Sequence, residues 1–229
     1  VSCTTRNLHE MLGQHLYGLL VATGLGVLVN FIARRTFSPE PLEGVGRWNW
    51  YVSLLVQSSV YPFLAIAAWH SHGFSTSWFV VGWSDRSIID MRFEAYFIYS
   101  FCGYLLKDMW ELRNNKLFVA HHIVCLAASF AALLIPSGVG LFVLVVFLLE
   151  FGTLTYNAKT LWPNVFFVRL IYWVVLSVSN AAALFLHVYL FSNQALATAA
   201  KLFAFTCCLG LVIGRQLEVC SDIKSHIIL

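Results

Sequence analysis

The chain has 229 residues, of which 59% are hydrophobic and only 11% carry a charge. Soluble domains average about 25% charged residues, so this composition excludes an ordinary soluble domain and predicts a polytopic membrane protein. The net charge is only +3, and the sequence has no basic run of the kind that binds nucleic acid, which excludes that class of partner.

Seven apolar stretches follow one another along the chain, and we expect each to cross the membrane. In lipid only helices and closed barrels satisfy the backbone, and continuous apolar runs do not fit the alternating pattern of a barrel strand. We therefore predict an all-α fold, a polytopic transmembrane bundle of about seven spans, as a single domain over residues 1–229 with a polar tail at 214–229. The predicted spans are residues 15–33, 50–69, 93–109, 117–135, 139–158, 168–191 and 195–213.

The basic residues predict the orientation of these spans. If seven spans alternate, most of the fourteen Lys and Arg residues fall on one side of the membrane. Loops rich in Lys and Arg stay in the cytosol, or in the matrix of a mitochondrion, so the amino terminus is predicted outside and the carboxyl terminus inside. The residues on the basic side are Arg34, Arg35, Arg47, Lys107, Arg113, Lys116, Lys159, Arg169, Arg215 and Lys224.

Unusual polar residues gather in the segment Lys107–Trp162, where almost everything around them is apolar. An ionisable side chain at mid-membrane costs roughly 2.5–3.5 kcal/mol, and it is kept where it faces a protein interior or a wet cavity. Such a cluster therefore favours a functional site. The residues concerned are Asp108, His121, His122, Glu150, Thr153 and Asn157.

The predicted topology brings these residues to one depth. Asp108 lies at the inner end of the third span, and the two histidines lie roughly 6–8 Å from the inner start of the fourth. Glu150 lies in the inner half of the fifth span, and at 100° per residue Asn157 follows it on the same face. We therefore predict one polar cavity between the third, fourth and fifth spans, open to the inner side.

Each of these residues also has a structural explanation. Asp108 would pair with Lys107, Arg113 or Lys116 at the interface, and Glu150 would accept a hydrogen bond from a His or an Asn. Adjacent histidines point about 100° apart, so they would not both face one pocket squarely, and one would pack against a neighbouring helix. The threonine and the asparagine would link helices.

Other kinds of chemistry have less support in the sequence. A His beside a carboxylate is a fair general base, but no nucleophile is obviously placed with it, since Cys125 and Ser129 lie one and two turns further along the same span. His70-x-His72 is too weak a pattern to predict a metal site. We expect neither a metal nor a bound cofactor, and acyl-CoA would enter only as a substrate.

Three motifs together resemble the TLC-domain family, which includes the ceramide synthases. They are Gly103-Tyr104-x-x-x-Asp108, the pair His121-His122 that opens an apolar span, and Glu150-x-x-Thr153-x-x-x-Asn157-x-Lys159-x-x-Trp162. The resemblance covers about residues 93–162. It implies a polytopic fold with a lipid-sized central cavity, usually in the endoplasmic reticulum, with the mitochondrial inner membrane as the alternative. The lipid-binding residues it implies are Tyr104, His121, His122, Glu150, Thr153 and Asn157.

Two functions follow from the residues and the resemblance. Ceramide synthases carry a pattern of His-Asp and Ser-Asp pairs after the double His. This chain has no His-Asp pair there, and its one Ser-Asp pair in that part of the sequence, Ser221-Asp222, lies in the polar tail, so the resemblance is closer to the small TLC-domain proteins. The first expectation is therefore a protein that binds or regulates membrane lipids, with lipids and other membrane proteins as partners. The alternative is an acyl-CoA-dependent acyltransferase, in which His121 or His122 is base or acyl carrier and Asp108 or Glu150 orients the imidazole.

Overall fold

The computed structural model describes residues 2–37, 40–83, 90–111, 116–135, 137–192, 194 and 196–227, and the fold is all-α. A short antiparallel hairpin of β1 (Pro41–Leu42) and β2 (Val45–Gly46) joins the first two helices, and a 3-10 turn, η2, covers Thr76–Phe79. The helices are α1 (Ser2–Thr36), α2 (Arg47–Leu55), the π-helical turn η1 (Val56–Val60), α3 (Tyr61–Ser71), α4 (Arg92–Glu111), α5 (Lys116–Ala132), α6 (Val139–Leu161), α7 (Phe166–Ser192) and α8 (Thr198–Ile227).

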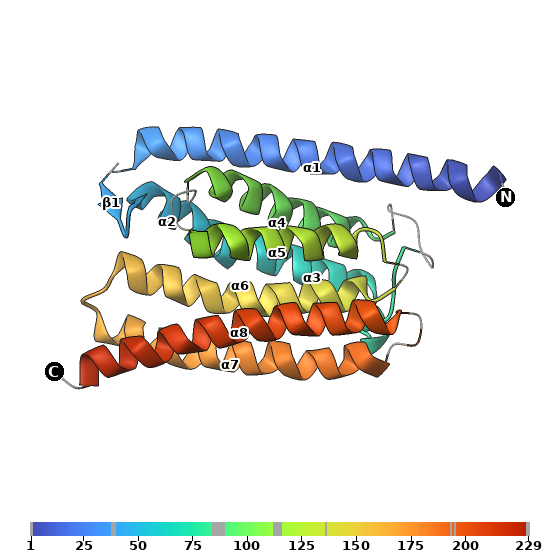
Figure 1. Cartoon of the computed structure of the whole chain (residues 1–229). Helices are drawn as coiled ribbons and strands as arrows, with labels where there is room; N and C mark the ends of the chain where they lie inside the picture. The colour runs from blue at the N-terminus through green and yellow to red at the C-terminus, as the bar shows by residue number, and fades with distance from the viewer. Residues whose placement is uncertain are drawn as a thin grey trace.

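Seven helical rods result, because α2, η1 and α3 continue one another over residues 47–71. The rods lie alongside one another and reverse direction at each turn, so that the two ends of the chain lie at opposite ends of the bundle (Figure 1). The all-α fold is thus confirmed, and there is a rod at each of the seven predicted positions.

Five of these rods are long and apolar enough to cross a membrane, counted over the part of the chain that the structure describes. They are α1, the rod of α2 to α3, α6, α7 and α8. The described apolar part of α5 is shorter, Val119–Ala132, and α4 carries several charged residues. The chain therefore has the helices of a membrane protein, and the count of seven crossings stays a prediction.

The second rod contains a π-helical turn directly before a proline. Pro62 has no backbone N–H and its ring crowds the carbonyl of the residue four positions earlier, and a π-turn is one way in which a helix absorbs such a defect. The hydroxyls of Ser58 and Ser59 both donate to the carbonyl oxygen of Leu55, which helps to satisfy the disturbed backbone. The turn also carries Gln57, which is only 1% exposed.

Helix α6 is the central element of the bundle. It packs against α7 on one side and against α2, η1, α3 and α4 on the other. It begins after Gly138, whose φ of 86° lies in the left-handed region that favours glycine, and it ends at Leu161, with Trp162 as its C-cap just before Pro163. The polar side chains Glu150, Thr155 and Asn157 of α6 are therefore buried between helices.

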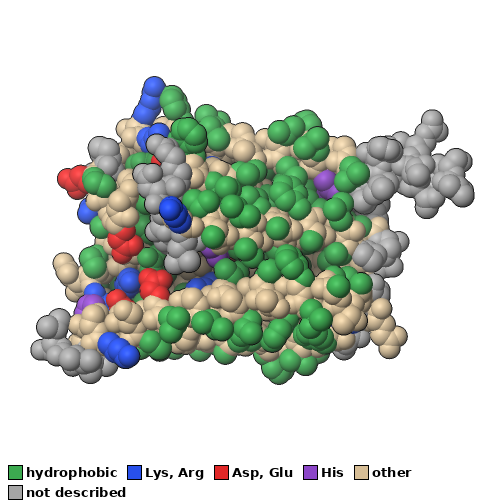
Figure 2. Space-filling view, viewed as in Figure 1, with side chains coloured by type: hydrophobic (Ala, Val, Ile, Leu, Met, Phe, Trp, Pro, Cys, Tyr) green, Lys and Arg blue, Asp and Glu red, His purple; other side chains and the backbone are tan. Residues whose placement is uncertain are grey.

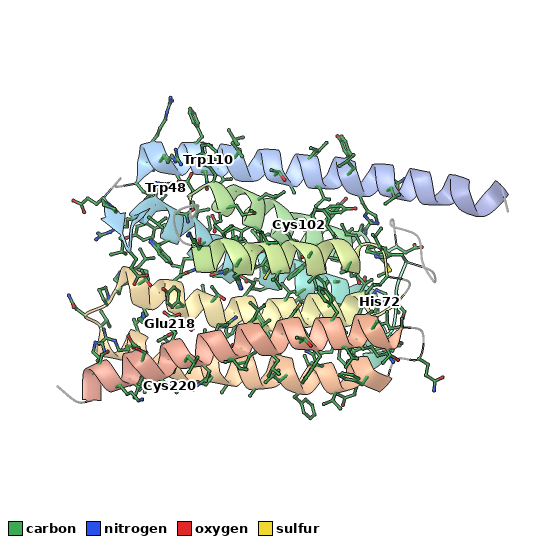
Figure 3. All side chains as sticks on the ribbon, in the orientation of Figure 1. Trp48, His72, Cys102, Trp110, Glu218 and Cys220 are labelled. Atoms are coloured by element: carbon green, nitrogen blue, oxygen red, sulfur yellow. The ribbon has the colours of Figure 1, made fainter. Side chains whose placement is uncertain are left out.

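Over the residues that the structure describes, the outer surface has an apolar flank and a charged end. Large hydrophobic side chains of α1, α7 and α8 are exposed along most of their length, and Figure 2 shows acidic and basic side chains gathered at the end of the bundle where α8 finishes. Trp48, Trp110 and Glu218 lie toward this end and His72 toward the other (Figure 3). An apolar flank is what a bilayer requires, and the charged end corresponds to the predicted inner side.

Residues 214–229 were expected to form a polar tail, but α8 continues through them to Ile227. Their polar side chains pack against α7 and α6: Trp173 Nε1 donates to Asp222 Oδ2 at 2.7 Å, and Lys159 Nζ lies 3.5 Å from Asp222 Oδ1. The last span was predicted to end at residue 213, where the hydropathy of the sequence falls. These ion pairs and hydrogen bonds carry the helix about four turns further.

Candidate functional site

A small polar pocket lies between the second rod, α4, α5 and α6, in the half of the bundle nearer the charged end. Its volume is about 70 Å³. The pocket was expected between the third, fourth and fifth spans, and the second rod adds a fourth wall to it. All the site residues chosen from the sequence line it, namely Tyr104, Asp108, His121, His122, Glu150, Thr153 and Asn157.

Glu150 is held by a glutamine from another rod. Gln57 Nε2 donates to Glu150 Oε2 at 2.7 Å, and Asn157 Nδ2 donates to Gln57 Oε1 at 2.7 Å. The observed donor to Glu150 is thus a glutamine, where a His or an Asn was expected, and Asn157 is connected to the carboxylate through Gln57. All three side chains are buried, so the amide of Gln57 fixes the orientation of the carboxylate.

Asp108 is buried with a cation beside it. Lys107 Nζ lies 2.7 Å from Asp108 Oδ1 and donates a second bond of 3.1 Å to Asn49 Oδ1. Both side chains of this ion pair are almost fully buried, so the pair is part of the interior and not of the interface. Of the other partners that were expected, Lys116 is exposed and Arg113 lies outside the described residues.

The two histidines point in different directions but both line the pocket. His122 Nε2 lies 4.0 Å from the second carboxylate oxygen of Asp108. His121 Nε2 lies 3.7 Å from the sulfur of Cys125, one turn along α5. The planes of the two rings are 70° apart, and His121 also lines the neighbouring apolar cavity. That the two rings do not both face the polar pocket squarely stays a prediction.

The remaining two residues of the predicted set make local bonds. Tyr104 donates from its hydroxyl to Ser53 Oγ at 2.6 Å, and Ser53 in turn donates to the backbone of Asn49. Thr153 donates to the carbonyl oxygen of Leu149 in its own helix at 3.1 Å. Both side chains form part of the pocket wall, and both hydroxyl protons are used in hydrogen bonds within the protein.

The second rod contributes residues to the pocket that were not predicted from the sequence. Asn49, Ser53 and Gln57 all line the pocket. They recur every four residues, which places them on one face of a helix, and this spacing of polar residues at the start of an otherwise apolar span is visible in the sequence. It is the pattern from which a fourth wall could have been predicted.

A second, apolar cavity of about 170 Å³ adjoins the polar pocket. Its walls come mainly from α5, α6 and α8, with His187 and Leu190 from α7. The two cavities share His121 and Glu150. From Glu150 to Gly138 the apolar cavity follows α6 for roughly 18 Å at 1.5 Å per residue. Figure 2 shows the hollow between α5 and α8 on this face of the molecule.

Arg215 reaches the polar end of the apolar cavity from α8. Its Nη2 atom donates to the carbonyl oxygen of Leu149 at 2.8 Å. The guanidinium fits there because residue 152 is a glycine, since an added Cβ would fall on Arg215 and on the hydroxyl of Ser179. The sequence analysis counted Arg215 only as a basic residue of the inner side, because the last span was expected to end at 213.

These features define an all-α protein whose described residues include five helices suited to cross a membrane. A polar pocket in it shares His121 and Glu150 with an adjoining apolar cavity. Comparisons of the chain with family models, with curated proteins and with solved structures give no match. The likeness to TLC-domain proteins therefore rests on the motifs between Gly103 and Trp162 alone.

Proposed function

We propose that the chain is a TLC-type integral membrane protein that binds a membrane lipid and thereby regulates lipid composition, as an accessory subunit of a larger membrane assembly. The observation that carries this proposal is the wall shared by the two cavities. His121 and Glu150 line both the polar pocket and the apolar cavity. A molecule that occupied both spaces would need a polar head and an apolar chain, which is the chemistry of a lipid.

The depth of the pocket supports an orientation for this lipid. The polar pocket lies toward the charged end of the bundle, and the apolar cavity extends from Glu150, at the middle of α6, to Gly138 at the opposite end. Headgroups lie at the membrane surface and chains in its interior, so the head would be near the inner leaflet, with the carboxyl terminus of the protein on that side. The endoplasmic reticulum is the membrane that the TLC resemblance favours, and the mitochondrial inner membrane is the alternative.

The test is to remove the polar wall and measure the lipid content. In the triple variant His121→Gln, His122→Gln and Glu150→Gln the head would lose its charged and imidazole partners. We expect mass spectrometry to detect less co-purified lipid than with the unchanged protein. The matched control is His70→Gln, because His70 is exposed at the other end of the bundle. Equal lipid content in the triple variant and the control would rule out headgroup binding at this wall.

One observation favours acyl transfer as a second candidate. His122 Nε2 lies 4.0 Å from Asp108 in a buried site, and a His with a neighbouring carboxylate is suited to take a proton from an amine or a hydroxyl. Acyl-CoA would be the substrate, and the basic residues Arg34, Arg35 and Lys116 near the inner end would hold its phosphates. Purified protein given labelled acyl-CoA with sphingoid-base or glycerolipid acceptors would form product. The absence of product with every acceptor would exclude this candidate.

A further inference from the structure

Arg215 is placed at the polar end of the apolar cavity with hydrogen-bonding capacity to spare. A guanidinium has five N–H donors. Among the described residues, Arg215 makes one hydrogen bond, to the carbonyl oxygen of Leu149, and its buried Nε has no partner. Arg215 is half-buried, and a buried N–H donor such as its Nε is costly when it is not satisfied, so this end of the cavity is suited to a ligand that brings hydrogen-bond acceptors.

The other charges near this end are largely accounted for. Lys107 lies against Asp108, so these two charges balance each other. Glu150 and Arg215 then remain as one anion and one cation, and both line the apolar cavity. Arg215 bonds to the backbone of Leu149, the residue directly before Glu150. Gln57 holds one carboxylate oxygen, Oε2, from the side of the polar pocket.

We propose that the apolar cavity binds a long-chain fatty acid, with its carboxyl group between Arg215 and Glu150. This inference rests on the proposed lipid binding and specifies the class of lipid. Two carboxyl groups that face each other in an apolar site retain one proton between them, because like charges cannot both be kept there. The pair then carries one negative charge, which Arg215 balances. The ligand enters as the neutral acid from the bilayer, and its hydroxyl donates to Glu150 while its other oxygen accepts from Arg215.

Other headgroups fit this arrangement less well. An amine would match Glu150 but would place a second cation beside Arg215. A phosphate stays ionised and would place at least one further negative charge beside Glu150, with no proton to share. An alcohol offers one oxygen and leaves most of the guanidinium donors unused. A cavity of about 170 Å³ is also small beside the 300–1,000 Å³ of usual ligand pockets, which favours one chain over the two chains of a phospholipid.

The experiment compares four ligands with the same chain on the purified full-length protein in lipid nanodiscs. Labelled palmitic acid is displaced by unlabelled palmitic acid, its methyl ester, the matching alcohol or the matching amine. We expect the acid to compete best. We also expect Arg215→Gln to weaken palmitate binding by about tenfold or more, the loss that follows removal of a charged hydrogen bond. The control is Lys224→Gln, which removes an exposed cation further along the same helix and should leave binding unchanged.

The outcomes separate this inference from the lipid-binding proposal on which it rests. If the alcohol or the ester competes as well as the acid, the fatty-acid assignment is wrong while lipid binding stands. The same holds if folded Arg215→Gln binds palmitate as tightly as Lys224→Gln does. If no chain of any headgroup binds to the unchanged protein, lipid binding in this cavity is itself wrong. The ligand series on the unchanged protein decides the question even if Arg215→Gln does not fold.

Discussion

Gln57 is the residue on which the polar pocket most depends. It donates to Glu150 and accepts from Asn157, so it links a carboxylate and an amide that lie two turns apart on α6. It is itself 1% exposed and belongs to the π-turn that precedes Pro62. A π-turn often marks a functional position in a helix, and here it brings a polar side chain to the centre of the bundle.

Replacement of Gln57 should therefore destabilise the protein. In Gln57→Ala the buried carboxylate and the buried amide both lose their partner, and each unsatisfied group costs about 1–3 kcal/mol. Thermal unfolding in detergent should show a clear fall in stability, whereas Gln194→Ala, at an exposed turn, should behave as the unchanged protein. A double-mutant cycle with Glu150→Ala should show strong coupling. Additive losses would mean that the observed hydrogen bond contributes little.

Many residues of the polar pocket could be predicted from the sequence, because they are polar residues in otherwise apolar segments. Glu150 and the pair His121–His122 stand out because lipid-embedded segments rarely carry ionisable groups. The partners were harder to identify, since Gln57 is uncharged and resembles any polar residue of a span. The contact of Arg215 depends on where α8 ends, which hydropathy alone does not determine.

At the scale of elements, α6 and α8 meet where a glycine leaves room for an arginine. Gly152 lies beneath the guanidinium of Arg215 and the hydroxyl of Ser179, so three helices approach one another at a position without a side chain. The predicted helix positions were right because apolar length indicates each rod. The end of α8 was wrong because its last turns are held by polar contacts with α7, such as the bond from Trp173 to Asp222, and these cannot be read from hydropathy.

Gly152→Ala should displace Arg215 from the carbonyl oxygen of Leu149. An added methyl group in a packed site usually costs about 1–3 kcal/mol, and here it also moves the cation away from the cavity. We expect a lower unfolding temperature together with weaker palmitate binding. The matched control is Gly210→Ala on α8, where an added Cβ meets nothing within 4 Å. That variant should keep or slightly raise stability. Equal behaviour of the two variants would show that Arg215 does not need this space.

At the scale of the whole molecule, the number of helices that pass a hydropathy test is smaller than the number of rods in the bundle. Five rods pass a test of length and apolar character, yet α4 and α5 lie alongside them in the same bundle (Figure 1). Helix α4 fails this test because of its charged residues, of which Lys107 and Asp108 face the interior and not the lipid, and α5 fails it because its described apolar part is short. A rod that turns its polar groups inward can cross a membrane with a lower mean hydropathy.

We therefore predict that α5 crosses the membrane, so that its two ends lie on opposite sides. Lys116→Cys and Leu134→Cys, both at exposed positions, would each be the single cysteine of a chain whose six native cysteines are replaced by Ser, and a third chain would keep Cys220 alone. Each would be treated with an impermeant maleimide in sealed, cytosolic-side-out vesicles. Lys116→Cys should react at once and Leu134→Cys only after permeabilisation. Native Cys220, exposed toward the charged end of α8, serves as the reference for the inner side. Labelling of Leu134→Cys in intact vesicles would show that α4 and α5 form a hairpin that does not cross.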